Sequence, residues 1–520
     1  MESPFSILRV LLLPLCFLLV MSVAAQDMSK VNNVTSAVYE FQLRAGIPNL
    51  LRKARTADGR TIRVAYLGGS ITEANGWRVK TLAGFKTRFP GVNWVDINAG
   101  VGGTGSDLGV FRLRKQVLDE NPDLMFVEFA VNDGGSGYTQ RAMEGIVRQT
   151  WANNPEIDII FVYTCNQSIL NNVKAGITDF AIKNMELIAT HYAVPSIHFG
   201  IEVQRLITKG DVVWKAPATK GEDIFTYDGT HPNDYGHYVY ASIVKRGFDE
   251  FVKDPAQTNP VFHTLGTPLN ANHWADARMV PVRQDMLTGI WTKSTTGSTG
   301  VDNAKRFSRW VTDIWYTNTA GSKLNLQFKG EVVGFFDILG PEGCLIRWKV
   351  NNGSESVFTR FDNGSTSTRT HYFFPSTVLS RDMVNSCSAA LDANNPSKRD
   401  ILEEAGKVAE YDANPAKFAP KVWYVGAVLL VGEEVKTSVE QNSIKESCIY
   451  PTSTSDRIYF NNLPIDCSIV LVDMSGKNLL VRKASDVNNG LSLQLFQSGI
   501  YLVKILQGNR IVQSVKVLKI

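Results

Sequence analysis

Ser70 directly follows an apolar run in the stretch V-A-Y-L-G-G-S-I-T-E, residues 64–73. The run is typical of a buried β-strand, and Gly68 and Gly69 permit a sharp turn at its end. A serine in such a turn can simply be the N-cap of a helix. It can also be a nucleophile, because a hydroxyl at the end of a core strand is open to substrate. That chemistry needs a base to remove the proton and a carboxylate to orient the base.

His231 is the candidate base. It lies in D-G-T-H-P-N, residues 228–233, just before an amphipathic pattern that predicts a helix. Gly229 and Pro232 favour a turn that folds the carboxylate of Asp228 back onto the imidazole. We therefore predict that Asp228 holds one ring nitrogen of His231 while the other faces Ser70. The other histidines are expected to be structural or to lie outside this part of the chain: His191, His198, His237, His263, His273 and His371.

Two loops could supply donors for the oxyanion of an acyl-transfer intermediate. N-A-G-V-G-G-T-G, residues 98–105, follows the second predicted strand, and its glycines let a backbone N–H approach a substrate closely. Gly103 is the preferred amide from its spacing, with Gly102 as the alternative. F-A-V-N-D, residues 129–133, ends the third predicted strand and offers the side-chain amide of Asn132. Each loop is weak evidence alone, but both follow strands, as Ser70 does.

Residues 61–255 alternate short apolar runs with amphipathic stretches. Strands that are apolar on both faces and separated by helices predict a parallel sheet covered on both sides, that is, a doubly wound α/β domain. In such folds the site lies outside the carboxyl ends of the strands. The serine and both loops are predicted at these ends, so we expect them to meet.

The four stretches resemble the sequence blocks of the SGNH hydrolases, also called GDSL-type esterases. The matching blocks are G-G-S-I-T at Ser70, N-A-G-V-G-G-T at Gly103, V-N-D at Asn132, and D-G-T-H-P at Asp228 and His231. The resemblance implies a flavodoxin-like sheet with Ser70 as nucleophile, His231 as general base and Asp228 as the carboxylate that orients it. It further implies an oxyanion hole made of the Ser70 and Gly103 amides and the Asn132 side chain, with no metal or cofactor.

The chain departs from the family pattern at two positions. Gly69 stands where aspartate is usual in the first block, and Ala130 stands where glycine is usual in the third. Neither position carries a catalytic group, so we expect activity to be retained, in a subfamily apart from the best-described lipases.

Two β-rich segments follow. Residues 264–435 contain alternating strands and turns rich in Gly, Asn and Ser, which predict a β-sandwich or jelly roll. Its tryptophans are expected in the core, with sugar stacking by one or two as the alternative. After a polar linker at 436–449, residues 450–520 predict a small all-β domain. Its V-D-M-S-G-K and S-G-I-Y-L-V elements, with Lys516 and Lys519 at the end, resemble type IX secretion sorting domains of Bacteroidetes. That resemblance implies handling by the type IX secretion machinery and removal of the tail.

The N-terminus also predicts export. Residues 1–25 combine Arg9, an apolar run and the small-residue exit V-A-A-Q, which is the pattern of a cleaved signal peptide, and residues 26–60 form a lead-in segment. The run is short and contains Pro14, which argues against a membrane anchor. The 520 residues carry a net charge of +4 without a basic stripe, so we expect no nucleic-acid partner.

Five cysteines remain after cleavage. Their spacing fits no zinc site, and export permits disulfides. Cys165 is expected to be a buried thiol. Cys344–Cys387 and Cys448–Cys467 are possible bridges.

These features predict a secreted or surface-located serine esterase. No long apolar lid is evident, which weakens a lipase hypothesis. An SGNH domain fused to a β-sandwich resembles carbohydrate esterases, so the preferred hypothesis is removal of O-acetyl groups from a polysaccharide. Two alternatives remain. One is a lipid, aryl or peptidoglycan esterase of the same fold, and the other is a surface glycan-binding protein without turnover.

Overall fold

The structure is a computed structural model. It describes residues 39–520 apart from 57, 135–136, 216–222, 256, 296–310, 312, 377, 436–447, 462, 464–466, 488–489 and 508–509. The predicted signal peptide, most of the lead-in segment and linker, and Trp310 therefore lie outside the described residues. The chain divides into two units, Met1–Val435 and Lys436–Ile520, each with apolar clusters of its own.

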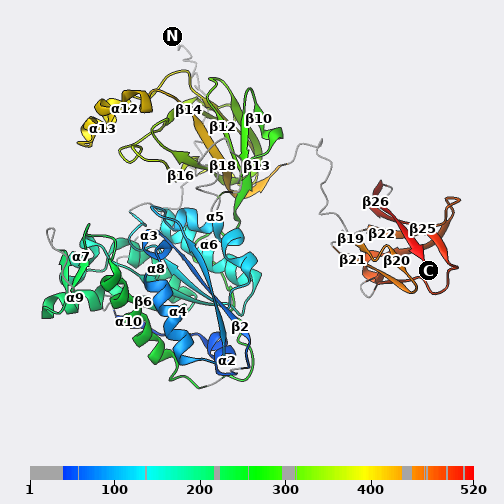
Figure 1. Ribbon diagram of the computed structural model, residues 1–520, viewed down its shortest axis with the longest axis horizontal. Helices are drawn as coiled ribbons and strands as arrows, with labels where there is room; N and C mark the ends of the chain where they lie inside the picture. The colour runs from blue at the N-terminus through cyan, green and yellow to red at the C-terminus, as the bar shows by residue number, and fades with distance from the viewer. Residues whose placement is uncertain are drawn as a thin grey trace, which may run out of the picture. The chain divides into compact units, whose positions relative to one another are not determined.

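The first half of the larger unit is an α/β body built on a six-stranded sheet (Figure 1). Five strands are parallel, and β1 adds to the edge antiparallel to β6. Numbered along the chain, the parallel strands lie in the order 2-1-3-4-5. This is the flavodoxin-like order, and it confirms the predicted doubly wound fold. Across the sheet the strands are β1 (Phe41–Gln42), β6 (Ser196–His198), β5 (Asp158–Tyr163), β4 (Leu124–Glu128), β2 (Thr61–Gly68) and β3 (Asn93–Gly100).

Helices connect these strands. Every residue of β4 and β5 is buried, which explains why both read as continuous apolar runs. The strand β1 and the helix α2 precede Thr61, where the sequence pattern of the α/β body begins. The sequence does not indicate β1, because a two-residue edge strand is too short to show a pattern. The helices are α2 (Pro48–Thr56), α3 (Ser70–Glu73), α4 (Trp77–Arg88), α5 (Ser106–Gln116), α6 (Tyr138–Asn153), α7 (Gln167–Lys174), α8 (Phe180–His191), α9 (Phe199–Lys209) and α10 (Asp234–Phe251). Two short strands, β7 (Val213–Lys215) and β8 (Ile224–Thr226), pair beside them.

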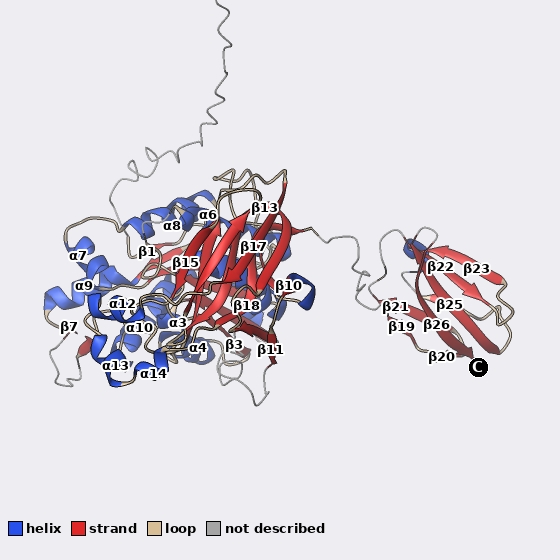
Figure 2. Cartoon of the chain, turned by 90° about the horizontal axis from the view of Figure 1, so that it is seen from above, coloured by secondary structure: helices blue, strands red, loops and turns tan. Residues whose placement is uncertain are grey.

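The second half of this unit is an antiparallel β domain, as predicted (Figure 2). Its strands are β9 (Ala277–Pro281), β10 (Leu287–Thr288), β11 (Thr292–Thr295), β12 (Asp313–Thr317), β13 (Lys323–Leu339), β14 (Cys344–Val350), β15 (Ser356–Arg360), β16 (Arg369–Ser376), β17 (Val384–Leu391) and β18 (Trp423–Glu434). Three short helices interrupt it between β17 and β18, namely α12 (Lys398–Glu404), α13 (Val408–Ala413) and α14 (Pro415–Phe418).

The two longest strands of the β domain, β13 and β18, are apolar on both faces because both faces are buried. One face packs into the core of the β domain through Val333, Phe335, Val428 and Leu430. The opposite face joins the core of the α/β body through Val332, Phe336, Leu429 and Val431. The alternation of side chains along a strand thus divides each sequence between two cores.

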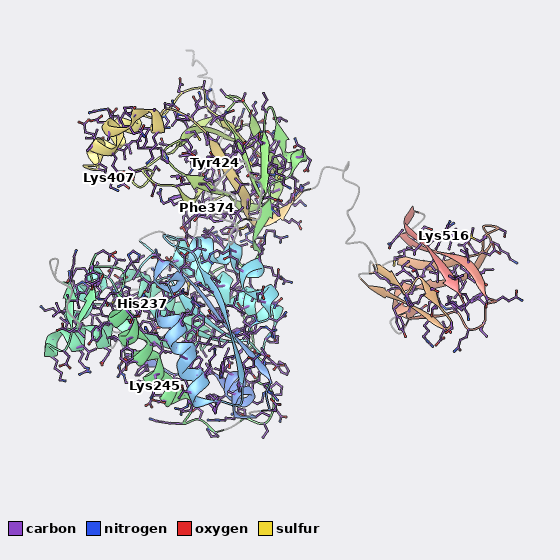
Figure 3. The ribbon with its side chains drawn as sticks, in the orientation of Figure 1. His237, Lys245, Phe374, Lys407, Tyr424 and Lys516 are labelled. Atoms are coloured by element: carbon purple, nitrogen blue, oxygen red, sulfur yellow. The ribbon has the colours of Figure 1, made fainter. Side chains whose placement is uncertain are left out.

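Aromatic and ionic contacts join the two parts. Phe374 of β16 lies 5.6 Å from the ring of Phe111 on α5 and 5.9 Å from that of Trp274. Figure 3 shows Phe374 on the side of the β domain that faces the α/β body. The buried carboxylate of Glu331 pairs with Arg141 of α6 and, at 2.9 Å, with Arg381. The β domain can therefore contribute side chains to the α/β body.

Neither of the two cysteine bridges that the sequence left possible is formed. Cys344, Cys387 and Cys467 are free thiols, and the side chain of Cys448 lies outside the described residues. Cys387 lies opposite Val350, at the far end of β14 from Cys344, so the two thiols are too far apart to bond. Cys165 is a buried thiol as predicted. Four of the tryptophans are buried, as expected for core residues, namely Trp274, Trp315, Trp348 and Trp423.

The smaller unit is all-β, also as predicted. It has a five-stranded sheet in the order β20-β26-β25-β22-β23 and a three-stranded sheet in the order β19-β21-β24, which share one apolar core. Ser475 and Gly476 lie in the turn between β22 and β23. The strands are β19 (Cys448–Tyr450), β20 (Ser453–Thr454), β21 (Arg457–Asn461), β22 (Cys467–Val472), β23 (Asn478–Lys483), β24 (Leu491–Ser492), β25 (Gly499–Gln507) and β26 (Arg510–Lys519).

Candidate active site

Ser70 is the first residue of a helix and not its cap. The strand β2 ends at Gly68, Gly69 is the N-cap of α3, and Ser70 opens the helix. The Ser70 hydroxyl lies 2.8 Å from Nε2 of His231. The serine thus sits in a strand-to-helix turn, at the point where the parallel strand order reverses and open α/β sheets bind ligands.

His231 is held by a tight turn between β8 and α10. The Thr226 hydroxyl donates to the His231 carbonyl oxygen at 2.7 Å, and Gly229 takes φ +87°, a conformation that favours glycine. Asn233 caps α10 by accepting a hydrogen bond from the Gly236 amide at 2.9 Å. Turn and cap together fix the direction of the imidazole.

Asp228 holds the other side of the ring. Its Oδ2 lies 2.6 Å from Nδ1 of His231, while its Oδ1 accepts hydrogen bonds at 2.8 Å from the backbone amides of Thr230 and His231. Burial acts to raise the pKa of Asp228, but these hydrogen bonds outweigh it and hold the pKa well below its usual range. The carboxylate is therefore ionised near neutral pH and can stabilise a charged imidazolium.

The other histidines of the α/β body are placed differently. His198 and His237 are buried, and burial lowers the pKa of each to about 4, so both are neutral structural groups. His263 follows the α/β segment in the sequence but packs back onto it, with Nε2 at 2.9 Å from Asp158. Asp158 opens β5 at the amino end of the sheet, so this Asp–His pair lies at the edge opposite Ser70.

The glycine loop after β3 passes beside Ser70. A Cβ on Gly102 would lie 3.6 Å from the Cβ of Ser70. The Gly102 amide donates to the carboxylate of Glu73 at 2.7 Å, so it is already engaged. Gly103 adopts φ +71°, and no described residue accepts a hydrogen bond from its amide. Of the two glycines, Gly103 is the one with an N–H available to a substrate.

Asn132 follows β4 in the chain and lies next to the turn that contains Gly69 and Ser70. A Cβ on Gly69 would lie only 2.1 Å from Oδ1 of Asn132, so the carboxamide occupies the space that a side chain at position 69 would need. The contact places the Asn132 carboxamide against the residue that directly precedes Ser70.

Gly69→Ala is expected to lower kcat on an ester by up to 10²–10³-fold, about the cost of losing one oxyanion donor. The backbone at Gly69 has φ −88°, which alanine adopts without strain, so the added methyl group acts only by displacing Asn132. Steady-state kinetics with p-nitrophenyl acetate would measure the effect.

Gly84→Ala is the matched control. Gly84 lies in α4, and a Cβ there meets nothing within 4 Å. This variant should keep wild-type kcat and gain about 0.5–1 kcal/mol of helix stability. A Gly69→Ala enzyme as fast as Gly84→Ala would show that Asn132 has no part in turnover.

Glu128 supports the turn that carries Ser70, although no sequence motif points to this residue. It is buried at the end of β4 and accepts hydrogen bonds from Thr72 at 2.8 Å and from Thr164 at 2.5 Å. The amide of Gly69 also donates to it, and burial raises the pKa of Glu128. The available signal was a lone acidic residue inside the apolar run L-M-F-V-E-F. Glu128 thereby ties α3 to the neighbouring strands.

Two sequence families match the chain. Residues 66–239 match the GDSL-like Lipase/Acylhydrolase family. The α/β body is a GDSL-like domain. Residues 448–519 match the Secretion system C-terminal sorting domain, so both resemblances drawn from the sequence are confirmed. No curated protein is significantly similar to the chain in sequence.

Two solved structures of an esterase share the two-domain fold. A crystal structure of a two-domain esterase (CEX) active on acetylated mannans, co-crystallised with mannopentaose, is 18% identical, and the alignment covers 77% of this chain and 100% of that one with a TM-score of 0.58. A second structure of a two-domain esterase (CEX) active on acetylated mannans is also 18% identical and covers 75% and 96%, again with a TM-score of 0.58. The acetyl xylan esterase Axe2 from Geobacillus stearothermophilus is 17% identical and covers 37% and 96%, with a TM-score of 0.28. At these identities the similarity to CEX concerns the fold.

The described residues lack two kinds of feature, a membrane-spanning helix and a cluster of metal ligands. No helix in this part of the chain is both long and apolar enough to cross a bilayer. Nor do three His, Cys, Asp or Glu side chains of the described residues group in a way that could hold a metal ion.

Proposed function

We propose that the chain is an exported serine esterase that removes O-acetyl groups from a polysaccharide. The hydrogen-bonded series from Ser70 through His231 to Asp228, at the carboxyl edge of a GDSL-like domain, carries the proposal. The side chains of Asp228 and His231 are each about half exposed, at 55% and 52%, which leaves the site open to a bulky substrate. The shared two-domain fold of esterases active on acetylated mannans supports the substrate class.

In the first half-reaction the Ser70 oxygen attacks the ester carbonyl carbon, and Nε2 of His231 takes the hydroxyl proton. The Gly103 and Ser70 amides and the Asn132 carboxamide stabilise the negative oxygen of the tetrahedral intermediate. When the intermediate collapses, the C–O bond to the sugar breaks. His231 then returns its proton to the sugar oxygen, and the acyl group stays on Ser70.

In the second half-reaction water takes the place of the sugar. His231 removes a proton from the water as its oxygen attacks the acyl-enzyme, and the same donors stabilise the second oxyanion. The bond to Ser70 breaks, the proton returns to the serine oxygen, and acetic acid is released as acetate. Asp228 stays ionised throughout and stabilises the imidazolium form of His231.

Two cavities of the larger unit lie away from Ser70. One of about 470 Å³ lies between α4 and α10, and another of about 440 Å³ lies beside α5 and β9. Neither is lined by Ser70 or His231, so an acyl group bound to the Ser70 oxygen does not extend into either of them. We propose that export uses the type IX secretion machinery. The machinery would recognise the sorting domain at 448–519, and this tail would then be removed.

The substrate test uses the full chain with acetylated mannan, acetylated xylan, and p-nitrophenyl acetate and decanoate. Ser70→Ala provides the background. We expect serine-dependent acetate release from at least one polysaccharide and faster turnover of p-nitrophenyl acetate than of the decanoate. Faster turnover of the decanoate would move the substrate to lipids. Glycan binding without turnover of any ester by the wild type would make the chain a binding protein.

A further inference from the structure

A tyrosine of the β domain reaches the loops that carry the proposed oxyanion donors. Tyr372, on β16, donates its phenolic hydrogen to Oδ1 of Asp107 at 2.6 Å, and the Gly105 amide lies 3.5 Å from the same phenol oxygen. Asp107 lies in the first turn of α5, directly after the glycine loop that contains Gly103. A side chain 265 residues away in the sequence therefore contacts the start of this helix.

The same helix start is bonded to the turn that carries Asn132. Asp133, the next residue, accepts a hydrogen bond from the Ser106 amide at 2.7 Å and another from the Ser106 hydroxyl at 2.6 Å. The glycine loop and the asparagine turn are thus linked through Ser106 and Asp133. The position of the start of α5 therefore affects both donor groups.

The carboxylates of Asp107 and Asp133 lie close together beside Gly105. A Cβ on Gly105 would lie 2.5 Å from Oδ1 of Asp133 and 2.9 Å from Oδ1 of Asp107, so both carboxylates face the same glycine. Burial and the charge of Asp107 raise the pKa of Asp133 to about 8. Burial also raises the pKa of Asp107, against the hydrogen bond from Tyr372, which lowers it. The phenol is thus the neutral donor that stabilises a carboxylate in a crowded, poorly solvated place.

We propose that Tyr372 is a positioning residue for the oxyanion hole. By donating to Asp107, it fixes the start of α5 and so sets the separation between the Gly103 amide and the Asn132 carboxamide. The β domain is on this basis part of the catalytic apparatus, and not only a neighbour of it. The inference rests on the esterase function proposed above, because it concerns the same oxyanion hole.

Tyr372→Phe tests the inference because it removes the hydroxyl and keeps the ring that packs near Phe374 and His371. With p-nitrophenyl acetate, kcat should fall about 10-fold, a part of the cost of losing a donor outright. KM should stay within about twofold and the melting temperature within a few degrees, because the hydrogen bond positions groups that act in the transition state. Asp107→Ala, which removes the acceptor, should lower kcat by a similar factor.

Tyr424→Phe is the matched control. Its phenol donates to Glu342 at 3.1 Å, so the variant breaks a tyrosine–carboxylate bond within the same β domain. It should keep wild-type kcat. In a background of Asn132→Ala, the substitution Tyr372→Phe should cost much less than it does in the wild type, since part of the hole it positions is already lost.

Three results would overturn the inference. They are an unchanged kcat in Tyr372→Phe, a rise in KM alone, and a loss that is equally large in the Asn132→Ala background. Each of these leaves the wild-type esterase active, whereas failure of the proposed function is a wild type that hydrolyses no ester. The two failures are therefore distinguishable in one set of assays.

Discussion

Ser70→Ala and His231→Ala are each expected to lower kcat for p-nitrophenyl acetate by about 10⁴–10⁶-fold, and the double variant should be no slower than either. The reason is that, in the proposed mechanism, Ser70 and His231 act as one unit across a hydrogen bond of 2.8 Å. Without the base the hydroxyl stays protonated, and without the hydroxyl the base has no proton to take. The activity that remains comes from the oxyanion donors and substrate binding, which both variants retain.

Single-turnover and steady-state kinetics on the three variants would measure these losses, with melting temperatures to show that each is folded. His191→Ala and Ser242→Ala are suitable controls, because they make the same changes on α8 and α10. The nearest hydrogen-bond partners of these two residues are backbone carbonyl oxygens, of Thr267 and Val239 respectively. Losses that multiply in the double variant would contradict the model of a single unit.

The sequence predicts which residues lie at the ends of the strands better than it predicts the side-chain contacts among them. Ser70, Gly103 and Asn132 could be placed together because parallel strands end at one edge, which follows from strand and helix periodicity alone. The choice between Gly102 and Gly103 depends on the Glu73 carboxylate, and spacing does not reveal the contact of that side chain. Glu128 likewise reads as part of an apolar strand until its partners are known.

Contacts between distant segments lie beyond pattern analysis for a physical reason. Periodicity reports which face of an element is buried but not what it is buried against. The phenol of Tyr372 sits on an ordinary alternating strand, and nothing local distinguishes it from a core tyrosine. The pair Asp158–His263 is similar, since the order of segments suggests that His263 belongs with the β-rich part. The failed cysteine bridges have the same origin, because strand register decides whether two thiols meet.

Asp228→Asn is expected to lower kcat by about 10⁴-fold near neutral pH, the loss seen when a triad carboxylate becomes an amide. The hydrogen bonds around Asp228 fix the orientation of the side-chain amide of the introduced asparagine. Two backbone amides, of Thr230 and His231, point at Oδ1 at 2.8 Å each, so the oxygen of an asparagine must stay there. The NH₂ group then faces Nδ1 of His231 in place of the oxygen that now lies 2.6 Å away.

Two donors cannot face each other, so the imidazole of Asp228→Asn must carry its proton on Nε2 and can no longer accept one from Ser70. Since the pKa of Asp228 lies well below its usual range, the wild-type carboxylate stays ionised at any pH where the enzyme would be assayed. A fall of wild-type activity between pH 7 and 5 would therefore report another group, and Asp228→Asn should be slow across that whole range. Asp234→Asn serves as the control with unchanged kcat, because Asp234 is an exposed partner of Lys80 at the start of α10. If Asp228→Asn kept a tenth or more of wild-type kcat, Asp228 would have no role in fixing the tautomer of His231.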